Sequence, residues 1–244
     1  METYPVALIT GSARRIGAAI AKYLHTQKYN VIIHYRNSEL EAKDLVAQFN
    51  ATRSNSAFCI KAELSNYAEM VMMVDGAKAH WGGVDLLVNN ASTFYPTPIG
   101  KSNLDDWDKI VDSNAKVPFY LSQLLSTELS NRNGSIINMI DIHANAPLAE
   151  HTIYCMAKSA VKMMTLSLAK ELAPTVRVNG VSPGAILWPS NDVGLTDEVK
   201  ANLLQEIPLA RLGSVIDIAK TVHFLAVSTY ITGQIITVDG GRSL

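Results

Sequence analysis

The sequence predicts a single-domain α/β protein of the Rossmann type, in which helices cover both faces of a doubly wound parallel sheet. Three observations lead to this prediction. Short β-rich apolar runs alternate with longer segments of helical period along the 244 residues. The apolar runs are continuous rather than alternating, as expected for strands that are buried on both faces. No internal repeat, low-complexity tract or Pro/Gly linker divides the chain, so residues 1–244 are predicted to form one domain.

The apolar runs give the expected strands in chain order. They are Val6–Ile9, Val31–His34, Phe58–Ile60, Leu86–Val88, Ile136–Met139, Val176–Val181 and Ile235–Val238. Helices are expected where apolar residues recur with a helical period. They are Ile16–Gln27, Leu40–Phe49, Tyr67–Trp81, a segment around Trp107–Leu129, Tyr154–Leu172 and Val215–Val227. This alternation implies right-handed βαβ units and therefore parallel strands.

Composition and charge argue against several classes of function. The chain is 48% hydrophobic and 18% charged, and Lys+Arg 21 against Asp+Glu 22 leaves a net charge of -1. This balance gives no electrostatic reason to expect nucleic acid or an anionic membrane as a partner. No apolar run reaches the roughly 18 residues of a membrane-spanning helix, and we find no signal peptide. The two cysteines lack paired ligand spacing, so we expect reduced thiols, no metal and a cytoplasmic protein.

A glycine-rich turn follows the first expected strand and opens the first expected helix. Gly11 permits a tight turn, and Gly17 permits close packing of the helix against the strand. The N–H groups at the helix start, around Ile16, suit a diphosphate. Arg15 stands where such turns usually carry a middle glycine, and its guanidinium has an obvious partner in a diphosphate. The turn therefore predicts a dinucleotide-binding domain.

The end of the second expected strand decides between the two nicotinamide cofactors. An NAD-specific site places Asp or Glu here to hold the ribose 2′-hydroxyl. This sequence instead has Tyr35, Arg36, Asn37 and Ser38. Arg36 and the two residues after it offer donors suited to a 2′-phosphate, and Arg14 lies on the neighbouring loop. These residues predict NADP as the cofactor.

Tyr154 and Lys158 are spaced so that both side chains lie on one face of a helix. A nearby ammonium favours the phenolate, so we expect the pKa of Tyr154 to fall toward the range where it can pass a proton near neutral pH. The pair follows a dinucleotide-binding turn and stands where a fifth strand should end. In this position it predicts a proton-delivery site.

Together these motifs resemble the short-chain dehydrogenase/reductase family over the whole chain. The resemblance rests on Thr10-Gly11…Gly17, Asn89-Asn90-Ala91, Asn114, Tyr154…Lys158 and Pro183-Gly184. It implies that Tyr154 is the acid, that Lys158 holds the nicotinamide ribose and that Asn114 supports a proton-relay water. It also implies cofactor contacts from Glu63 and Leu64 over the adenine, Asn90 and Ala91 along the adenosine, and Pro183 and Gly184 under the nicotinamide.

One position departs from the general pattern of that family. Most members carry a serine thirteen residues before the tyrosine, and here that position is Asp141. A carboxylate accepts hydrogen bonds rather than donating them, so it is poorly suited to polarising a ketone. It suits a nitrogen heterocycle, whose N–H groups need an acceptor and whose ring nitrogen needs a proton.

Four stretches, residues 10–17, 34–38, 89–98 and 137–141, together resemble the pteridine reductases. That resemblance implies that Phe94 stacks a pterin against the nicotinamide, that Arg15 and Ser92 contact pterin and cofactor phosphate, and that Asp141 and Tyr154 deliver the proton. The predicted reaction is NADPH-dependent reduction of a dihydropterin or dihydrofolate to the tetrahydro form. Compared with protozoan members, the stretch after Ile99 is shorter and the segment Ile186–Leu195 differs; that segment belongs to the expected substrate lid, around 186–207. Dihydrobiopterin, dihydromonapterin and dihydrofolate therefore all stay open as substrates.

Two alternatives compete with this reading. A carbonyl reductase of the same fold, acting on a ketone or an acyl thioester, would have little use for Asp141 and Phe94. A non-catalytic NADP-binding sensor would not need Tyr154, Lys158 and Asn114. The expected helices Trp107–Leu129 and Tyr154–Leu172 are apolar enough to predict a homotetramer. Three histidines are expected to be isolated and satisfied surface or lid residues rather than ligands: His143, His151 and His223.

Overall fold

The computed structural model describes residues 4–188 and 196–244, and its centre is a seven-stranded sheet in which every neighbouring pair is parallel. The strand order is β3-β2-β1-β4-β5-β6-β7. The strands are β1 (Val6–Ile9), β2 (Asn30–Tyr35), β3 (Ala57–Lys61), β4 (Leu86–Asn89), β5 (Ser135–Met139), β6 (Arg177–Pro183) and β7 (Ile235–Val238). The predicted Rossmann-type sheet is confirmed, and the strand ends differ from the prediction by at most two residues.

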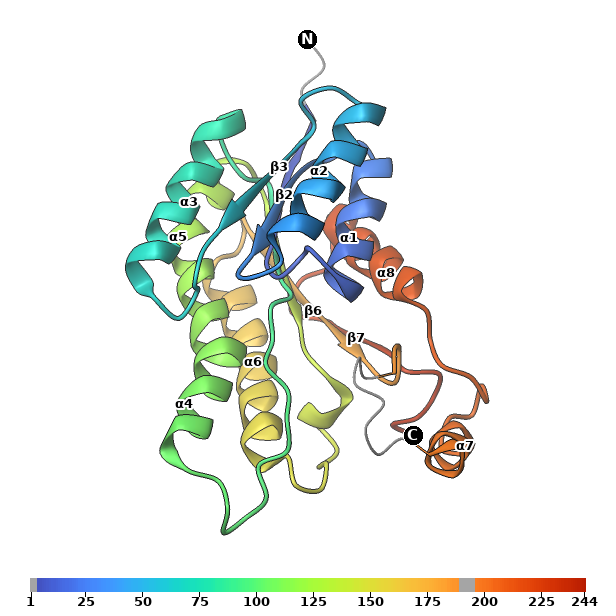
Figure 1. Ribbon diagram of the computed structural model, residues 1–244. Coiled ribbons are helices and arrows are strands. Elements are labelled where there is room, and N and C mark those ends of the chain that lie inside the picture. Colours follow the sequence, from blue (N-terminus) through green and yellow to red (C-terminus); the bar gives the residue numbers. More distant parts are fainter. Residues whose placement is uncertain (1–3, 189–195) are drawn as a thin grey trace.

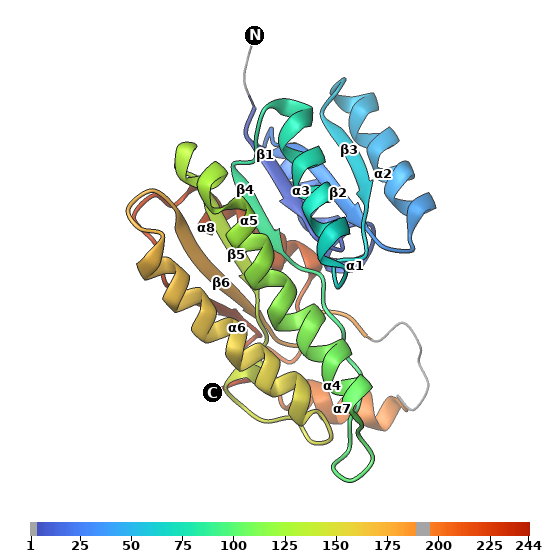
Figure 2. The ribbon, with the colours of Figure 1, turned by 90° about the vertical axis from the view of Figure 1, so that its left-hand side faces the viewer.

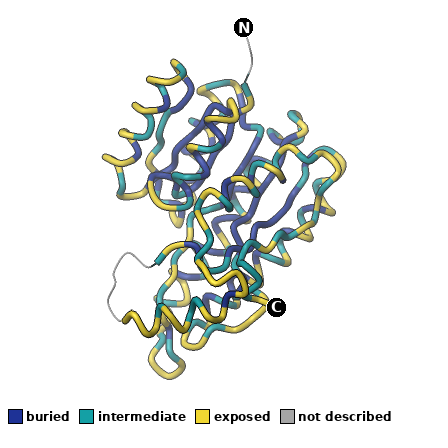
Figure 3. Tube along the Cα trace, turned by 90° about the vertical axis from the view of Figure 1, so that its right-hand side faces the viewer, coloured by how far each residue is buried: buried dark blue, intermediate teal, exposed yellow. Residues whose placement is uncertain are grey.

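Helices cover both faces of the sheet, as Figures 1 and 2 show. Alternate residues of the central strands point to opposite layers: Ile9 and Ile33 belong to one apolar cluster, and Leu8 and Ile32 to the other. The first cluster is shared with α1 (Arg15–Thr26), α2 (Glu39–Thr52) and α8 (Val215–Val227). The second is shared with α3 (Tyr67–Trp81), α5 (Val117–Asn131) and α6 (Thr152–Glu171). In Figure 3 the inner strands of the sheet are dark blue, since they are buried on both faces, whereas the edge strands β3 and β7 are only partly buried and the outer sides of the helices are exposed.

The order of the strands places the site. The chain runs from β1 outward to β3 and then returns to pair β4 with the other side of β1. The connections therefore leave β1 and β4 in opposite directions, and ligands of open α/β sheets bind beyond the carboxyl ends of the strands at such a point. The glycine-rich turn after β1 and the Asn89-Asn90-Ala91 segment after β4 meet here.

The predicted helix around Trp107–Leu129 is divided into three parts. α4 (Leu104–Val111) passes through one π-helical turn, Asp112–Lys116, into α5. Pro118 lies in the first turn of α5 and has no N–H with which to bond the carbonyl of Asn114, four residues before it. A regular α-helix therefore cannot run through Asn114. Single π-helical turns of this kind are rare and frequently occur at functional sites.

Two elements were not predicted. A short 3-10 turn, Ile142–Ala144, follows β5. α7 (Asp197–Gln205) falls within the predicted lid of residues 186–207 and lies beside the C-terminus in Figure 1. No residue of α7 is fully buried, so its sequence lacks the apolar period by which the other helices were found. Residues 189–195 of the predicted lid lie outside the described part of the chain. No helix within that described part is both long and apolar enough to cross a membrane.

Candidate functional site

The turn between β1 and α1 has a backbone shape that its sequence makes possible. Gly11 has φ +61, and a Cβ placed on Gly17 would lie 2.5 Å from the carbonyl oxygen of Gly11 and 2.6 Å from Nδ2 of Asn90. Only glycine fits at position 17. Arg15, at the expected middle-glycine position, also has a positive φ, 54°. An arginine in this strained conformation is uncommon away from functional sites.

The turn is fixed by hydrogen bonds from the segment after β4. Thr10 Oγ1 accepts the backbone N–H groups of Asn90 and Ala91, both at 2.9 Å. The side-chain amide of Asn90 donates to the carbonyls of Thr10 (2.8 Å) and Gly11 (3.2 Å). α1 then begins without a side-chain cap and without an acidic residue in its first turn. Its first N–H groups are therefore suited to an anionic ligand.

A cavity of about 780 Å³ lies beyond the carboxyl ends of these strands. Its lining includes every predicted cofactor residue except Lys158, Pro183 and Gly184. The opposite side is formed by the end of α4 and the π-helical turn, with Asp112 and Ser113. Asp112 and Ser113 were not predicted from the sequence, because the one signal for this side of the cavity is the interruption of a helical pattern at Pro118. The size, the glycine cradle and the basic residues fit a dinucleotide.

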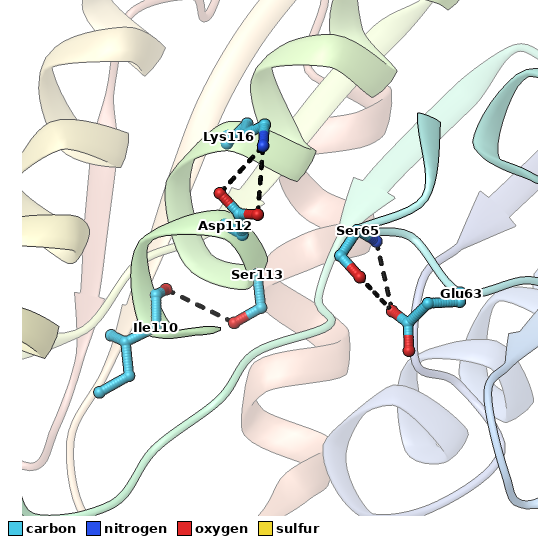
Figure 4. Close-up of polar contacts among 6 residues, drawn as sticks. All are labelled: Glu63, Ser65, Ile110, Asp112, Ser113 and Lys116. Atoms are coloured by element: carbon cyan, nitrogen blue, oxygen red, sulfur yellow. Dashed lines mark hydrogen bonds and ion pairs between the residues drawn. The ribbon is translucent and has the colours of Figure 1, made fainter. Parts of the chain in front are cut away.

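Two exposed ion pairs include residues that line the cavity, among them Arg14, Arg36 and Glu63. Arg36 lies 3.5 Å from Glu63, and Glu63 also accepts hydrogen bonds from the backbone N–H (3.2 Å) and the hydroxyl (3.0 Å) of Ser65. Arg14 makes a similar pair with Glu41, also at 3.5 Å. Figure 4 shows Glu63 and Ser65 facing the π-helical turn, where Asp112 pairs with Lys116. Exposed pairs of this kind contribute little stability, so Arg36 can exchange its partner for a phosphate at small cost.

The proton-delivery residues lie together beside β5. α6 presents Tyr154 and Lys158 on one buried face, and Asp141 follows the end of β5. The hydroxyl of Tyr154 donates to Oδ2 of Asp141 at 2.8 Å, while Oδ1 of Asp141 accepts the N–H of His143 at 2.9 Å. Lys158 Nζ donates to the carbonyl of Met139 at 3.0 Å and lies 5.6 Å from the centre of the Tyr154 ring.

The pKa of Tyr154 shifts in the direction opposite to the one we expected. Burial raises the pKa above its ordinary value, and the charge of Asp141 and the hydrogen bond to it raise it further. Burial lowers the pKa of Lys158 to about 8, with Asp141 opposing this shift. The expectation that Lys158 lowers the pKa of Tyr154 is therefore wrong for this structure. Lys158 bonds a backbone carbonyl, and the nearest charge to the phenol is a carboxylate.

Phe94 stands at the open side of this group. Its side chain is 52% exposed, and its ring meets that of Tyr154 edge to face, with centres 4.8 Å apart and planes at 77°. Another side of the ring stacks on His151 at 4.5 Å and 13°. His223, another of the three histidines named from the sequence, has a ring that contacts two tyrosines, Tyr23 and Tyr29. The only signal for His151 was its place just before the helix that carries Tyr154.

The other predicted site residues lie around this core. Asn114 is buried in the π-helical turn, and its amide donates to the carbonyls of Thr93 (2.7 Å) and Ile110 (3.0 Å). Pro183 ends β6, and the N–H of Gly184 bonds Val238 of β7 at 3.0 Å. Arg15 donates to the carbonyl of Trp188, at the start of the predicted lid, at 3.2 Å. Within residues 4–188 and 196–244, no three His, Cys, Asp or Glu side chains gather as metal ligands would.

Comparisons with known proteins give one matching family model and relatives of two kinds. A family model described as enoyl-(acyl carrier protein) reductase matches residues 11–243. Pteridine reductase 1 of Leishmania tarentolae is 37% identical over 284 residues, covering 99% of this chain and 97% of that protein. The 3-oxoacyl-[acyl-carrier-protein] reductase FabG of Staphylococcus aureus is also 37% identical, over 245 residues and 99% of both chains. That of Staphylococcus epidermidis is 36% identical over 239 residues, covering 96% and 97%.

Proposed function

The chain belongs to the short-chain dehydrogenase/reductase family of oxidoreductases, and from this premise we propose that it is an NADPH-dependent pteridine reductase. The substrate is a dihydropterin or dihydrofolate, reduced to the tetrahydro form. The hydrogen bond from Tyr154 to Asp141 carries this proposal. A carboxylate that accepts a hydrogen bond from the tyrosine hydroxyl has no proton to donate to a ketone oxygen, but it can accept the N–H groups of a heterocycle.

The cofactor follows from the charges around the cavity. Among residues 4–188 and 196–244, the ion-pair partner of Arg36 is the exposed Glu63, and the three residues directly after β2, Arg36, Asn37 and Ser38, include no carboxylate for a ribose 2′-hydroxyl. In this proposal Arg36, Asn37 and Ser38 hold the 2′-phosphate, Arg15 and the start of α1 hold the diphosphate, and Lys158 holds the nicotinamide ribose. The bound dinucleotide supplies the hydride.

The proton comes from the chain. Because burial and Asp141 raise the pKa of Tyr154, its hydroxyl keeps its proton at neutral pH. A raised pKa makes the phenol a weaker acid, so in this proposal Tyr154 gives up its proton only as the substrate nitrogen becomes basic during hydride transfer. The protonated hydroxyl is the state a reduction needs, since a ring nitrogen of the substrate must gain a proton as the neighbouring carbon gains hydride. Asp141 keeps this proton on Tyr154 and offers its oxygens to the substrate N–H groups.

Phe94 suits a flat heteroaromatic substrate. Its ring is backed by His151 and Tyr154 and remains half exposed at the mouth of the site. A pterin stacked on such a ring gains attraction beyond the burial of its surface. In the proposed complex Phe94 lies on the side of the substrate away from the nicotinamide, and Arg15 and Ser92 contact the substrate from the cofactor side.

The proposed assembly is a homotetramer. Large apolar side chains are exposed along the helices that flank the catalytic residues: Trp107, Phe119, Met156 and Met163. Exposed apolar surface on adjacent helices is typical of a subunit interface. Light scattering coupled to size-exclusion chromatography measures the mass of the assembly directly, and a monomeric mass would contradict the proposal.

The function is tested by following NADPH oxidation with dihydrobiopterin, dihydromonapterin, dihydrofolate, a simple ketone and a 3-oxoacyl thioester. We expect turnover with at least one dihydropterin and little with the ketone or the thioester. Asp141→Ser should lower kcat/KM for the pterin roughly tenfold to a hundredfold, because substrate N–H groups lose a charged acceptor at about 1–3 kcal/mol each. Asp141→Asn is the matched control. It keeps the size and shape of the side chain, but it removes the charge and replaces one of the two acceptor oxygens by an NH2 group.

Two results would contradict the proposal. A wild-type enzyme that reduces the thioester or the ketone well and ignores every pterin is a carbonyl reductase, as the identity to the 3-oxoacyl reductases also allows. An Asp141→Ser variant with undiminished pterin turnover would show that the carboxylate does not recognise the substrate.

A further inference from the structure

His34 lies in β2 next to its carboxyl end, and both of its ring nitrogens have backbone partners. The side chain is 3% exposed. Nδ1 accepts the N–H of Gly11 at 2.9 Å, and Nε2 lies 3.1 Å from the carbonyl oxygen of Ala62. The backbone carbonyl of His34 accepts the N–H of Ser12 at 3.0 Å. This one residue therefore contacts the glycine turn twice and the segment after β3 once.

Only one state of the His34 ring satisfies both contacts. The Ala62 carbonyl can only accept, so Nε2 must carry a proton. The N–H of Gly11 can only donate, so Nδ1 must offer a lone pair. The ring is therefore neutral, with its proton on Nε2. An imidazolium would direct an N–H at the N–H of Gly11 and lose that hydrogen bond.

The two segments joined by His34 form different parts of the cofactor cavity. Gly11 opens the turn that leads to the start of α1. Ala62 directly precedes Glu63 and Leu64, which line the adenosine end. His34 and Ala62 line the same cavity. The His34 ring therefore spans the separation between the turn that suits a diphosphate and the segment that suits an adenine.

We propose that His34 is a positioning residue for the dinucleotide, whose neutral ring sets the glycine turn and the Glu63-Leu64 segment at the spacing that the diphosphate and the adenine require together. This inference rests on the proposed dinucleotide function of the cavity. Because His34 does not reach the reacting atoms, it acts on binding and leaves the chemical step unchanged. Its loss should raise the dissociation constant of the cofactor without lowering kcat at saturation.

The same geometry makes cofactor binding sensitive to acid. Burial lowers the pKa of His34 below 6.5, while the Ala62 carbonyl and Glu63 oppose this shift and Arg36 adds to it. The folded protein therefore binds fewer protons at His34 than the unfolded chain does. The contribution of His34 to stability is lost as the pH falls from 6.5 through the lowered pKa, and the ring of the folded protein gains its proton only near that lowered pKa. Protonation breaks the bond to Gly11 and should weaken binding.

Two substitutions separate the contacts of His34. His34→Leu keeps the bulk and removes both side-chain hydrogen bonds. His34→Asn places an amide oxygen where Nδ1 stood and keeps the acceptor for Gly11, but it does not titrate. From fluorescence titration with NADPH at neutral pH, we expect the dissociation constant to rise about tenfold or more in His34→Leu, which loses both contacts, and by a smaller factor in His34→Asn, which keeps the contact with Gly11 and loses the one with Ala62. kcat at saturating NADPH should stay within about twofold of the wild type in both variants.

The matched control is His25, which is also buried and also has a lowered pKa. It bonds the hydroxyl of Ser56 at 2.7 Å and stacks on Phe49, near the opposite end of α1 from the glycine turn. His25→Leu should lower the melting temperature as His34→Leu does, but leave the NADPH dissociation constant within about twofold. Equal weakening of binding in both variants would reduce His34 to a general stabilising role and overturn the proposal.

The acid dependence is tested with NADP⁺, the acid-stable form of the cofactor. The 2′-phosphate itself titrates at a pKa of about 6, so wild type and His34→Asn share that effect and only their difference reports on His34. We expect the wild type to lose affinity more steeply than His34→Asn as the pH falls through the lowered pKa of His34, which lies below 6.5. Parallel curves, or unchanged NADPH affinity in His34→Leu, would overturn the role of His34 alone. A wild-type protein that binds no dinucleotide would overturn the proposed function and this inference together.

Discussion

The cofactor side and the catalytic side of the site are held in shape by different interactions. On the cofactor side the shape is set by backbone and neutral groups, as in the close approach at Gly17 and the bonds from Asn90 and His34. Its charged side chains are exposed and weakly paired. On the catalytic side Tyr154 and Lys158 are withdrawn from water beside the carboxylate of Asp141, so charge and protonation set the geometry.

This difference predicts that substitutions on the two sides affect different quantities, the affinity for the cofactor and the rate of the reaction. When a neutral backbone contact of the cavity is lost, the affinity for the cofactor changes. The protonation states of the reacting groups do not change, because none of them takes part in that contact. A buried cluster of titratable groups behaves in the opposite way, since each member fixes the protonation of the others. Substitutions on the cofactor side should therefore alter dissociation constants, and substitutions on the catalytic side should alter turnover.

The largest expected effect is on the catalytic side. Tyr154→Phe keeps the ring and removes the proton, and general-acid catalysis is typically worth about 10²–10⁴-fold. We expect pterin turnover to fall by that order while the NADPH dissociation constant changes less than about twofold. Single-turnover kinetics with saturating NADPH measure the first quantity, and fluorescence titration measures the second. A variant that retains more than about half of its activity would show that another group supplies the proton.

The next effect is on the cofactor side and concerns the choice between NADPH and NADH. A charge-assisted hydrogen bond contributes roughly 1.5–3 kcal/mol, so Arg36→Ala should reduce the preference for NADPH about tenfold to a hundredfold. Turnover at saturating cofactor should be little affected. Paired titrations with both cofactors give the ratio, which cancels general losses of stability.

Glu63 offers a control in the opposite direction. Glu63→Gln removes the charge that now pairs with Arg36 and should raise the preference for NADPH, since the arginine no longer has to exchange partners. Equal dissociation constants for the two cofactors in the wild type would refute NADP specificity. An unchanged ratio in Arg36→Ala would show that other donors read the phosphate.

The fold was accessible from the sequence because its strands are buried on both faces, which leaves continuous apolar runs. β1, all of whose residues are buried, was predicted with its observed ends for this reason. α7 was not, because no residue of α7 is fully buried. The π-helical turn at Asn114 arises because Pro118 cannot bond the carbonyl of Asn114. It was not predicted from the sequence, because a helical period of apolar residues continues on both sides of it. Periodicity therefore finds elements that pack against the sheet and misses those that do not.

The site was accessible only in part. The spacing of Tyr154 and Lys158 places both on one face of α6, as predicted, but the direction of the pKa shift depends on burial and on which neighbour the hydroxyl meets. Spacing does not contain that information. The stack of Phe94 on His151 joins two loops far apart in the chain, and no local pattern marks it. The backbone positions of the site residues could thus be predicted from the sequence, and the direction of the pKa shift of Tyr154 could not.

The smallest expected effect tests whether the substrate pocket behaves like the cofactor side or the catalytic side. Phe94 lies within the catalytic cluster, yet an aromatic ring carries no charge and stacks on the substrate in the ground state as well as in the transition state. Phe94→Ala should therefore raise KM for a dihydropterin about threefold to tenfold, from a stacking energy of roughly 0.5–1.5 kcal/mol, with a smaller change in kcat. His151→Leu, which removes only the ring behind Phe94, should give a weaker effect in the same direction, and Phe224→Ala, an exposed phenylalanine on α8, should give none. Steady-state kinetics at saturating NADPH separate KM from kcat. A loss confined to kcat would instead place Phe94 among the groups that fix the proton of Tyr154, and the division between the two sides would then lie outside the substrate pocket.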